Sequence, residues 1–329
     1  MKRVLIIRFS SIGDIVLTTP VIRCLKKHLG SESEIDFLTK GQYQPILKAN
    51  PYLNEVFTID KSTKEIESVL SDKNYDFVVD LHKNVRSKGI AKKLSGVYSS
   101  FPKLNIEKWL YTNFKIDRLP EIHIVDRYFE AVKHLGVRND EKGIEYFIPQ
   151  EDEVDVAKVY GLQNYLTVAI GAQFVTKQLP SVKLVDILKR VNLPIVLLGG
   201  KDDGLKANEV KKQLPQQNII NLCGKINLNQ SASILKQSKV LLTHDTGLMH
   251  IAAAFDIKIV SVWGNTVPKL GMYAYLPKQP SLLKVHEVED LKCRPCSKIG
   301  HQKCPKKHFK CMMLQNEQAI AEDINSFTA

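Results

Sequence analysis

The sequence lacks any apolar run long enough to span a bilayer. Its apolar runs fall well short of the ~20 residues that a transmembrane helix needs, and the opening MKRVLIIRFS is too short and too soon charged for a secretory signal. A length of 329 residues and a hydrophobic content of 44% are ordinary for a globular protein. We therefore expect a cytoplasmic chain with two folded domains.

Several common motifs are also missing. There is no GxGxxG dinucleotide fingerprint and no GxxxxGK[ST] phosphate loop, which argues against typical NAD enzymes and P-loop NTPases. The GxSxG nucleophile elbow is absent. So is any Asp-x-Asp, the usual metal-nucleotide clamp of one large sugar-transferase architecture. A metal-free reaction on a nucleotide sugar is compatible with all these absences.

Acidic residues are too few to balance the basic ones. The chain has 47 Lys and Arg against 35 Asp and Glu, a formal net charge of +12. Such an excess favours nucleic acid, an anionic membrane surface or a phosphorylated small molecule as partner. Basic residues are enriched in 81–93 and 304–310, although such runs also occur on ordinary solvated surfaces. Aromatic and basic residues do not interleave as in RNA-binding sheets, so no nucleic-acid partner is expected.

Cysteine is sparse outside the C-terminal region. Cys24 and Cys223 stand in apolar surroundings and are expected to be buried thiols. The other four can form a structural metal site, such as zinc, or pack as reduced thiols: Cys293, Cys296, Cys304 and Cys311. Their Cys-x2-Cys pair favours a metal, with His301 and His308 as further ligands, but the later gaps are not a standard zinc-finger spacing. Neither interpretation gives the cysteines a catalytic role.

Short apolar runs alternate with amphipathic segments through most of the chain. The runs predicted as strands form two series: 3–9, 34–40, 55–60 and 76–82, then 165–171, 193–200, 218–224, 239–245 and 258–264. Continuously apolar strands that alternate with helices are typical of parallel sheets covered on both faces. We predict an α/β fold with two doubly wound, Rossmann-like domains that face each other across a cleft.

The polar, acidic stretch 137–155 is the expected linker. It separates an N-terminal domain over 1–150 from a C-terminal domain over 151–315. The final segment 316–329 is predicted as a helix that can pack back on the N-terminal domain. Its apolar residues can share one side: Ala319, Ile320, Ile324 and Phe327.

Three strand ends carry unusual polar residues. In open parallel sheets, ligands bind beyond the carboxyl ends of the strands, where loops and helix N-termini meet. The first such loop, SSIGD, contains a glycine that lets the backbone approach a ligand closely. Its Asp14 can be an N-cap carboxylate or a general base for a substrate hydroxyl. Either Thr19 caps a helix with Pro20 at its first position, or the helix begins near Asp14 and bends at Pro20.

The second and third loops have features of a nucleotide site. In HDTGLMH the strand is predicted to end at Asp245, and the helix that follows presents free N–H groups and the positive end of its dipole. Asp245 could instead only cap this helix, and His250 could be a packed core histidine. Lys177, beyond another strand end, can neutralise charge on a leaving group. Asp203 is well placed for a ribose or sugar hydroxyl.

Four stretches taken together resemble the heptosyltransferases of glycosyltransferase family 9: SSIGDIVLTTPVIRCLKK, TKQLP, IVLLGG and HDTGLMHIAAAF. The segment LKCRPCSKIGHQKCPKKHFKCM is also similar to the cysteine-bearing tail of many members. The resemblance implies the GT-B fold, with the acceptor on the N-terminal domain and the nucleotide sugar on the C-terminal one. It also implies inverting, metal-independent transfer of a heptose from ADP-heptose to the lipopolysaccharide core.

The resemblance implies roles for individual residues as well. Asp14 matches the general base, and Lys177 matches the lysine that meets the donor phosphates. Lys83 and Arg86 could contact an anionic glycolipid acceptor at the inner membrane face, or could belong to a plain surface helix. The donor-binding residues are expected to be Ser10, Ser11, Gly13, Asp203, Asp245, Thr246, Gly247, Leu248 and His250.

Two departures from the family pattern leave the sugar open. Leu179 stands where members often have an aromatic residue, and Ala172 and Gln173 stand where hydroxyl residues are frequent. A GT-B transferase of another sugar or a nucleotide-sugar epimerase is therefore an alternative. So is a catalytically silent nucleotide-sugar-binding protein of envelope assembly. No cofactor is expected beyond the zinc that the cysteines could hold.

Overall fold

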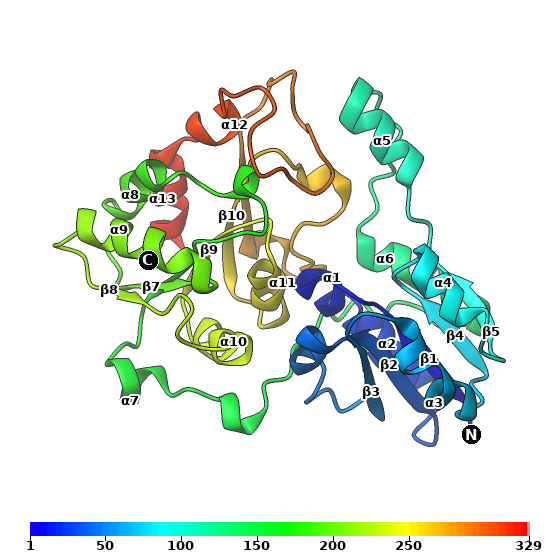
Figure 1. Ribbon diagram of the computed structural model, residues 1–329. Helices are drawn as coiled ribbons and strands as arrows, with labels where there is room; N and C mark the ends of the chain where they lie inside the picture. Colours follow the sequence, from blue (N-terminus) through cyan, green and yellow to red (C-terminus); the bar gives the residue numbers. More distant parts are fainter. Residues whose placement is uncertain (328–329) are drawn as a thin grey trace. The chain divides into compact units, whose positions relative to one another are not determined.

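Two all-parallel sheets flanked by helices form the framework of the computed structural model (Figure 1). The structure describes residues 1–327. The first unit comprises Met1–Lys103 and Ile122–Pro149, and the second comprises Leu104–Glu121 and the chain from Gln150 onward. The main boundary lies inside the expected linker. However, the division at residue 150 was wrong for 104–121, which cluster with the second unit.

The sheet of the first unit has the strand order β3-β2-β1-β4-β5. Its strands are β1 (Arg3–Ile7), β2 (Glu34–Lys40), β3 (Glu55–Ile59), β4 (Phe77–Asp80) and β5 (Val97–Ser100). The central strand β1 pairs with β2 and β4, and Ile7 lies opposite both Leu38 and Asp80. The loops that follow β1 and β4 therefore leave the sheet side by side.

The helices of the first unit are α1 (Ile12–Val16), α2 (Thr19–Leu29), α3 (Glu67–Asp72), α4 (Val85–Ala91) and α6 (Ile124–Phe129). A helix does begin near Asp14, but it ends at Val16, and Thr18 is the N-cap of a separate helix. Pro20 lies in the first turn of α2, where its missing N–H costs no helical hydrogen bond. Seven consecutive residues of α2, from Thr19 to Leu25, are buried, and Gly13, Ile15 and Val16 of α1 are buried as well.

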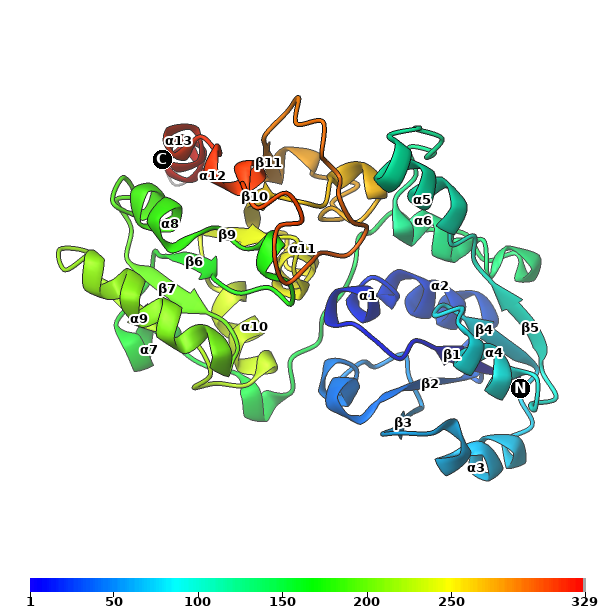
Figure 2. The same cartoon turned by 45° about the horizontal axis from the view of Figure 1, so that its top comes forward.

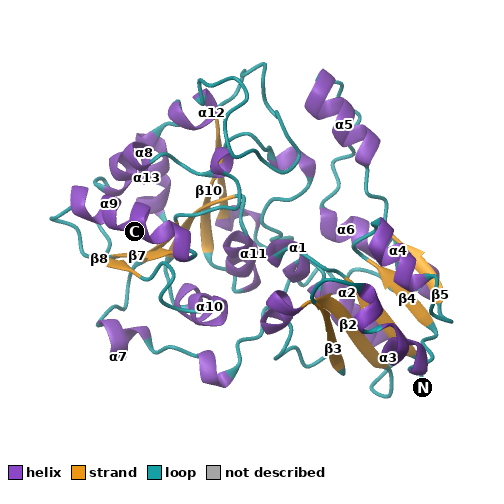
Figure 3. Cartoon of the chain, viewed as in Figure 1, coloured by secondary structure: helices purple, strands orange, loops and turns teal. Residues whose placement is uncertain are grey.

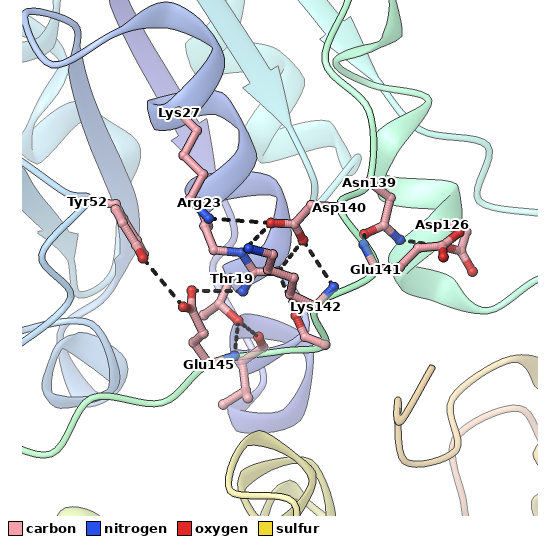
Figure 4. A network of polar contacts seen from close by, with 12 residues as sticks. Thr19, Arg23, Lys27, Tyr52, Asp126, Asn139, Asp140, Glu141, Lys142 and Glu145 are labelled. Carbon is pink, nitrogen blue, oxygen red and sulfur yellow. Dashed lines mark hydrogen bonds and ion pairs between the residues drawn. The ribbon is translucent and has the colours of Figure 1, made fainter. Parts of the chain in front are cut away.

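A polar network joins α2 to the segment that leads toward the second unit (Figure 4). The buried Arg23 guanidinium contacts Asp140 Oδ1 at 2.7 Å, Glu145 Oε2 at 2.9 Å and the Gly143 carbonyl at 2.8 Å. Thr19 Oγ1 accepts a hydrogen bond from the Glu145 N–H. The start of the predicted linker is therefore held on the first unit by buried ionic contacts.

The sheet of the second unit has the order β11-β10-β9-β6-β7-β8, and Figure 2 labels all of these strands except β8. Its strands are β6 (Leu166–Ala169), β7 (Ile195–Leu198), β8 (Ile219–Asn221), β9 (Val240–His244), β10 (Lys258–Trp263) and β11 (Leu283–Glu287). β6 and β9 are neighbours at the centre, so the loops that begin after Ala169 and His244 leave the sheet together. Strand β11 and, in the first unit, β5 were not predicted.

The helices of the second unit are α5 (Asn105–Phe114), α7 (Val156–Tyr160), α8 (Ser181–Leu188), α9 (Gly204–Gln213), α10 (Leu228–Lys236), α11 (Gly247–Ala254), α12 (Lys310–Met313) and α13 (Glu317–Ser326). Ile320 and Ile324 of α13 lie in the core of this unit, so the expectation that the C-terminal helix packs on the N-terminal domain was wrong. Residues 328–329 of that predicted helix lie outside the described residues. No helix among residues 1–327 is both long enough and apolar enough to cross a membrane.

Candidate functional site

Asp14 lies in the first turn of α1, at the carboxyl end of β1. Its Oδ2 accepts hydrogen bonds from the Ser11 N–H at 3.1 Å and the Ser11 hydroxyl at 2.8 Å. The N-cap of α1 is Ser11 rather than Asp14, and the two residues form a reciprocal capping box. Asp14 nevertheless stays partly exposed, with 21% of its side chain accessible. It therefore supports the helix start and still presents a carboxylate to solvent.

Arg8, directly after β1, is the charge partner of Asp14. Its Nη2 lies 2.5 Å from Asp14 Oδ1, while Nη1 and Nε donate to the carbonyls of Leu81 and Ser10. Burial, the largest single effect, would lower the pKa of Arg8, but the charge and hydrogen bond of Asp14, together with Tyr128 and Asp80, raise it above the ordinary value. The guanidinium is thus a permanent cation that fixes one carboxylate oxygen and joins the loops after β1 and β4. The sequence did not predict Arg8 as a site residue, because Arg8 lies near the end of an apolar run that was predicted to be a strand.

His82 stands beside this pair on the loop after β4. Asp80 shapes the loop, since its Oδ1 accepts the N–H groups of His82 and Lys83. The His82 ring lies 5.0 Å from the Phe9 ring. Burial, followed by the charge of Arg8, lowers the pKa of His82 to about 3, so the imidazole is neutral near pH 7.

The two residues expected to meet an acceptor have different surroundings. Lys83 donates from Nζ to the Phe101 carbonyl at 2.7 Å, which directs its ammonium toward the protein. Arg86 is exposed on α4, and its guanidinium lies over the Phe9 ring at 5.9 Å. Arg86 is therefore the better placed of the two to bind an anion near Asp14.

Lys177 and Asp245, from two of the strand-end loops, form an ion pair in the second unit. Lys177 Nζ lies 2.6 Å from Asp245 Oδ2, and both side chains are about one-seventh exposed. The same oxygen accepts a hydrogen bond from Thr266 Oγ1 at 3.0 Å. β9 ends at His244, so Asp245 lies in the turn rather than in the strand. The arrangement is a paired cation and anion directly before a helix N-terminus.

Helix α11 begins at Gly247 without a side-chain cap. Thr246 is the N-cap residue, but its hydroxyl is 3.2 Å from Thr243 Oγ1 and accepts no bond from the helix. The Thr246 side chain therefore does not cap the backbone N–H groups at the start of α11. The positive end of the helix dipole at Gly247 follows directly after Asp245, the ion-pair partner of Lys177. His250, three residues after Gly247, is buried with only 2% of its surface accessible, which fits a packed core position.

The loop that carries Lys177 is anchored on both sides. His244 is 2% exposed, and its Nε2 accepts the Leu179 N–H at 2.9 Å. Lys206 donates to the Leu179 carbonyl at 2.8 Å and to the Ile170 carbonyl at 3.3 Å. Burial, with the charge of Lys206 acting in the same direction, lowers the pKa of His244 to about 3. Leu179 is therefore a structural residue whose backbone positions Lys177.

Asp203 closes a turn at the ends of β6 and β7. Its Oδ2 accepts the Gly200 N–H at 2.8 Å. A Cβ atom at Gly171 would lie 2.0 Å from the same oxygen, so any side chain at 171 would displace the Asp203 carboxylate. The expected contact of Asp203 with a ribose or sugar hydroxyl stays a prediction.

Asn265 is a site residue that sequence reasoning missed. It is fully buried, and neither polar atom of its amide has a hydrogen-bond partner among residues 1–327. Its backbone contacts Thr176, the neighbour of Lys177, and its own neighbour Thr266 binds Asp245. A buried polar group without a partner is costly, so this amide marks a position for a ligand or an ordered water. Nothing in its sequence context, WGNT, distinguishes it from a turn residue.

Three of the C-terminal cysteines, Cys293, Cys296 and Cys304, lie in the long loop between β11 and α12 (Figure 3), and Cys311 lies in α12. Cys293 Sγ is 3.9 Å from His308 Nε2, while Cys311 is buried. Within residues 1–327, no three His, Cys, Asp or Glu side chains are arranged to hold a metal ion. Cys24 and Cys223 are buried thiols, as predicted. Zinc binding by the other four stays a prediction from the sequence alone.

Comparisons with known proteins agree with this architecture. The family model described as glycosyltransferase family 9 (heptosyltransferase) matches residues 64–303. Lipopolysaccharide heptosyltransferase 3 of Escherichia coli is 27% identical over 285 residues, which cover 77% of this chain and 81% of that protein.

Two solved structures are similar over nearly the whole chain. A glycosyl transferase family 9 protein from Veillonella parvula has a TM-score of 0.77 at 22% identity, covering 99% of this chain and 97% of that one. The heptosyltransferase WaaC of E. coli, solved with ADP, has a TM-score of 0.70 at 20% identity, covering 99% of each chain. These similarities confirm the predicted GT-B fold of two Rossmann-like domains.

Proposed function

This chain belongs to glycosyltransferase family 9, and on that premise we propose that it transfers a heptose from ADP-heptose to a lipopolysaccharide core acceptor. The observation that carries the proposal is the cation Lys177 beside the uncapped start of α11, a site that suits a diphosphate. The name of the E. coli relative and the ADP in the WaaC structure support the choice of sugar and nucleotide.

Asp14 acts as the general base. The acceptor hydroxyl attacks the anomeric carbon of the heptose, and its proton passes to the Asp14 carboxylate as the new C–O bond forms. Arg8 and Ser11 hold this carboxylate in one orientation before substrate arrives. The neutral His82 does not compete as a proton donor near pH 7, because its pKa of about 3 lies far below.

Lys177 and α11 stabilise the departing ADP. As the bond between the anomeric carbon and the diphosphate breaks, negative charge grows on the phosphate oxygens. Lys177 and the N–H groups of Gly247 and Leu248 can meet that charge without a metal. Attack on the face opposite the leaving group inverts the anomeric configuration. The step is balanced because the acceptor proton ends on Asp14 and ADP leaves with the electron pair of the broken C–O bond.

The acceptor is proposed to be an anionic glycolipid, reached from the cytoplasmic side of the inner membrane. Arg86 is exposed near Asp14 and can bind a phosphate or carboxylate of that acceptor. The formal net charge of +12 favours association with such a surface.

A thermal-shift screen against nucleotide sugars tests the donor. A ligand that binds the native state raises the unfolding temperature by mass action. We expect ADP-heptose and ADP to raise it by several degrees, and UDP-, GDP- and CMP-linked sugars to raise it little. A larger shift with another nucleotide sugar would assign the chain to a different donor. The product of a subsequent transfer assay, analysed by NMR, reports whether the configuration inverts.

A further inference from the structure

Helix α5 presents large apolar side chains to solvent. Ile106, Trp109 and Phe114 are 72%, 54% and 58% exposed, and none of the helix is buried. Ile106 and Trp109 are three residues apart and are neighbours on the helix surface. The Trp109 and Phe114 rings lie 5.0 Å apart, so the apolar groups are contiguous. Ile116, just beyond the helix, is 45% exposed. Contiguous exposed apolar groups of this size mark a surface that binds something.

Helix α5 is held on the rest of the second unit by Tyr111 and by Lys115 at its C-terminal end. Tyr111 packs with Leu119 against Val267 and Leu270. Lys115 Nζ donates to the Pro295 carbonyl at 2.6 Å, which links the helix to the cysteine-bearing tail. The apolar side therefore stays exposed on a helix whose other contacts hold it in place.

The cysteine-bearing tail, residues 292–310, contains basic residues and no acidic ones. Seven of its residues are Lys or Arg. Three of these lysines, Lys292, Lys306 and Lys310, line an open recess together with His308. A recess lined by ammonium groups suits a phosphate, and Ile299 adds a further exposed apolar side chain to this tail.

We propose that α5 and the tail 292–310 form a docking surface for an anionic phospholipid bilayer. Trp and Phe favour the boundary between headgroups and acyl chains, and clustered lysines are attracted to acidic headgroups. The combination of exposed aromatic residues and a net positive tail matches that partner on both counts. The docking surface rests on the proposed function in one respect only: membrane binding would bring the enzyme to a lipid-anchored acceptor.

Vesicle binding tests the proposal on the full-length protein. We expect cosedimentation with phosphatidylglycerol-containing vesicles, little with pure phosphatidylcholine, and weakening at high salt. The chain has two tryptophans, and Trp263 is buried, so a blue shift of fluorescence on binding reports Trp109.

Two variants and one control separate the contributions. The triple substitution Lys306→Gln, Lys307→Gln and Lys310→Gln is expected to reduce partitioning roughly 100-fold. Trp109→Ala with Phe114→Ala is expected to reduce binding and abolish the blue shift. Lys211→Gln with Lys212→Gln, exposed on α9, should leave binding within about twofold despite the loss of charge.

Three outcomes of these experiments would contradict the proposed docking surface. Equal binding to neutral vesicles, an equal loss in the α9 control, or tighter binding to single-stranded nucleic acid than to vesicles would overturn the proposal. The thermal shift with ADP is measured on each variant as well. If the variants keep the ADP shift and still bind vesicles as the wild type does, only the docking surface is refuted. If ADP causes no shift in the wild type, only the proposed donor is refuted.

Discussion

At the scale of single residues, both candidate charges are already engaged by the protein. Asp14 is held by Arg8 and Ser11, and Lys177 is paired with Asp245. A carboxylate that caps a helix can also take a proton, because one structural role fixes the orientation that the chemical role needs. The choice between cap and base that the sequence left open is therefore not exclusive.

Lys177 is expected to contribute directly to donor affinity. Lys177→Gln removes the cation beside α11 while keeping much of the side-chain volume, and a charged hydrogen bond to phosphate is worth roughly 10- to 100-fold in affinity. Calorimetric titration with ADP measures the change. Lys189→Gln, on the exposed part of the same unit, is the charge-matched control. An unaltered dissociation constant for the Lys177 variant would remove this residue from the donor site.

At the scale of elements, the sequence predicted what was buried and missed what was exposed. Each of the nine predicted strands exists, the edge strands β3 and β8 included. The other seven lie inside a sheet, where parallel strands are continuously apolar. β5 and β11 were missed because they are partly exposed and their sequences, VYSS and LKVHE, carry no apolar run. The sequence also did not predict that residues 104–121 belong to the second unit. Their assignment depends on the packing of Tyr111 against Val267 and not on the local sequence pattern.

The ionic network on α2 makes the first unit sensitive to acid. Burial, the largest single effect, would raise the pKa of Asp140, but hydrogen bonds from Arg23 and the Lys142 N–H, with the charges of Arg23 and Lys27, together lower it to about 2. A carboxylate with a depressed folded-state pKa stabilises the fold above its unfolded value of about 3.9, and this is lost as the pH falls through about 2. The pair should therefore contribute about 2 kcal/mol at neutral pH that disappears between about pH 4 and pH 2.

Urea unfolding of the wild type and two variants at a series of pH values measures this contribution. Asp140→Asn should lower the free energy of unfolding at pH 7 and flatten its dependence on pH below about 4. Glu141→Gln, an exposed neighbour, should leave the curve as it is. If Asp140→Asn keeps the full acid dependence of the wild type, other carboxylates are responsible for it.

At the scale of the whole molecule, each of the two α/β units carries its own group of candidate residues at the carboxyl ends of its strands. The sequence predicted both groups, because each lies in a loop that follows a central apolar strand. It did not reveal Arg8, His82 or Asn265, whose positions beside those loops depend on strand order and on side-chain packing. Under the proposed function, Asp14 of the first unit is the base and Lys177 of the second unit is the cation that meets the leaving group.

The most direct test of this account is turnover by Asp14→Asn. The variant keeps the size of the side chain but lacks the charge that accepts the proton. We expect heptose transfer from ADP-heptose to fall by roughly 100-fold or more, while calorimetry shows ADP binding unchanged. Ser11→Ala, which leaves the carboxylate and its contact with Arg8 in place, should lose far less. Transfer at the wild-type rate by Asp14→Asn would contradict the account, because the proton would then have to go elsewhere.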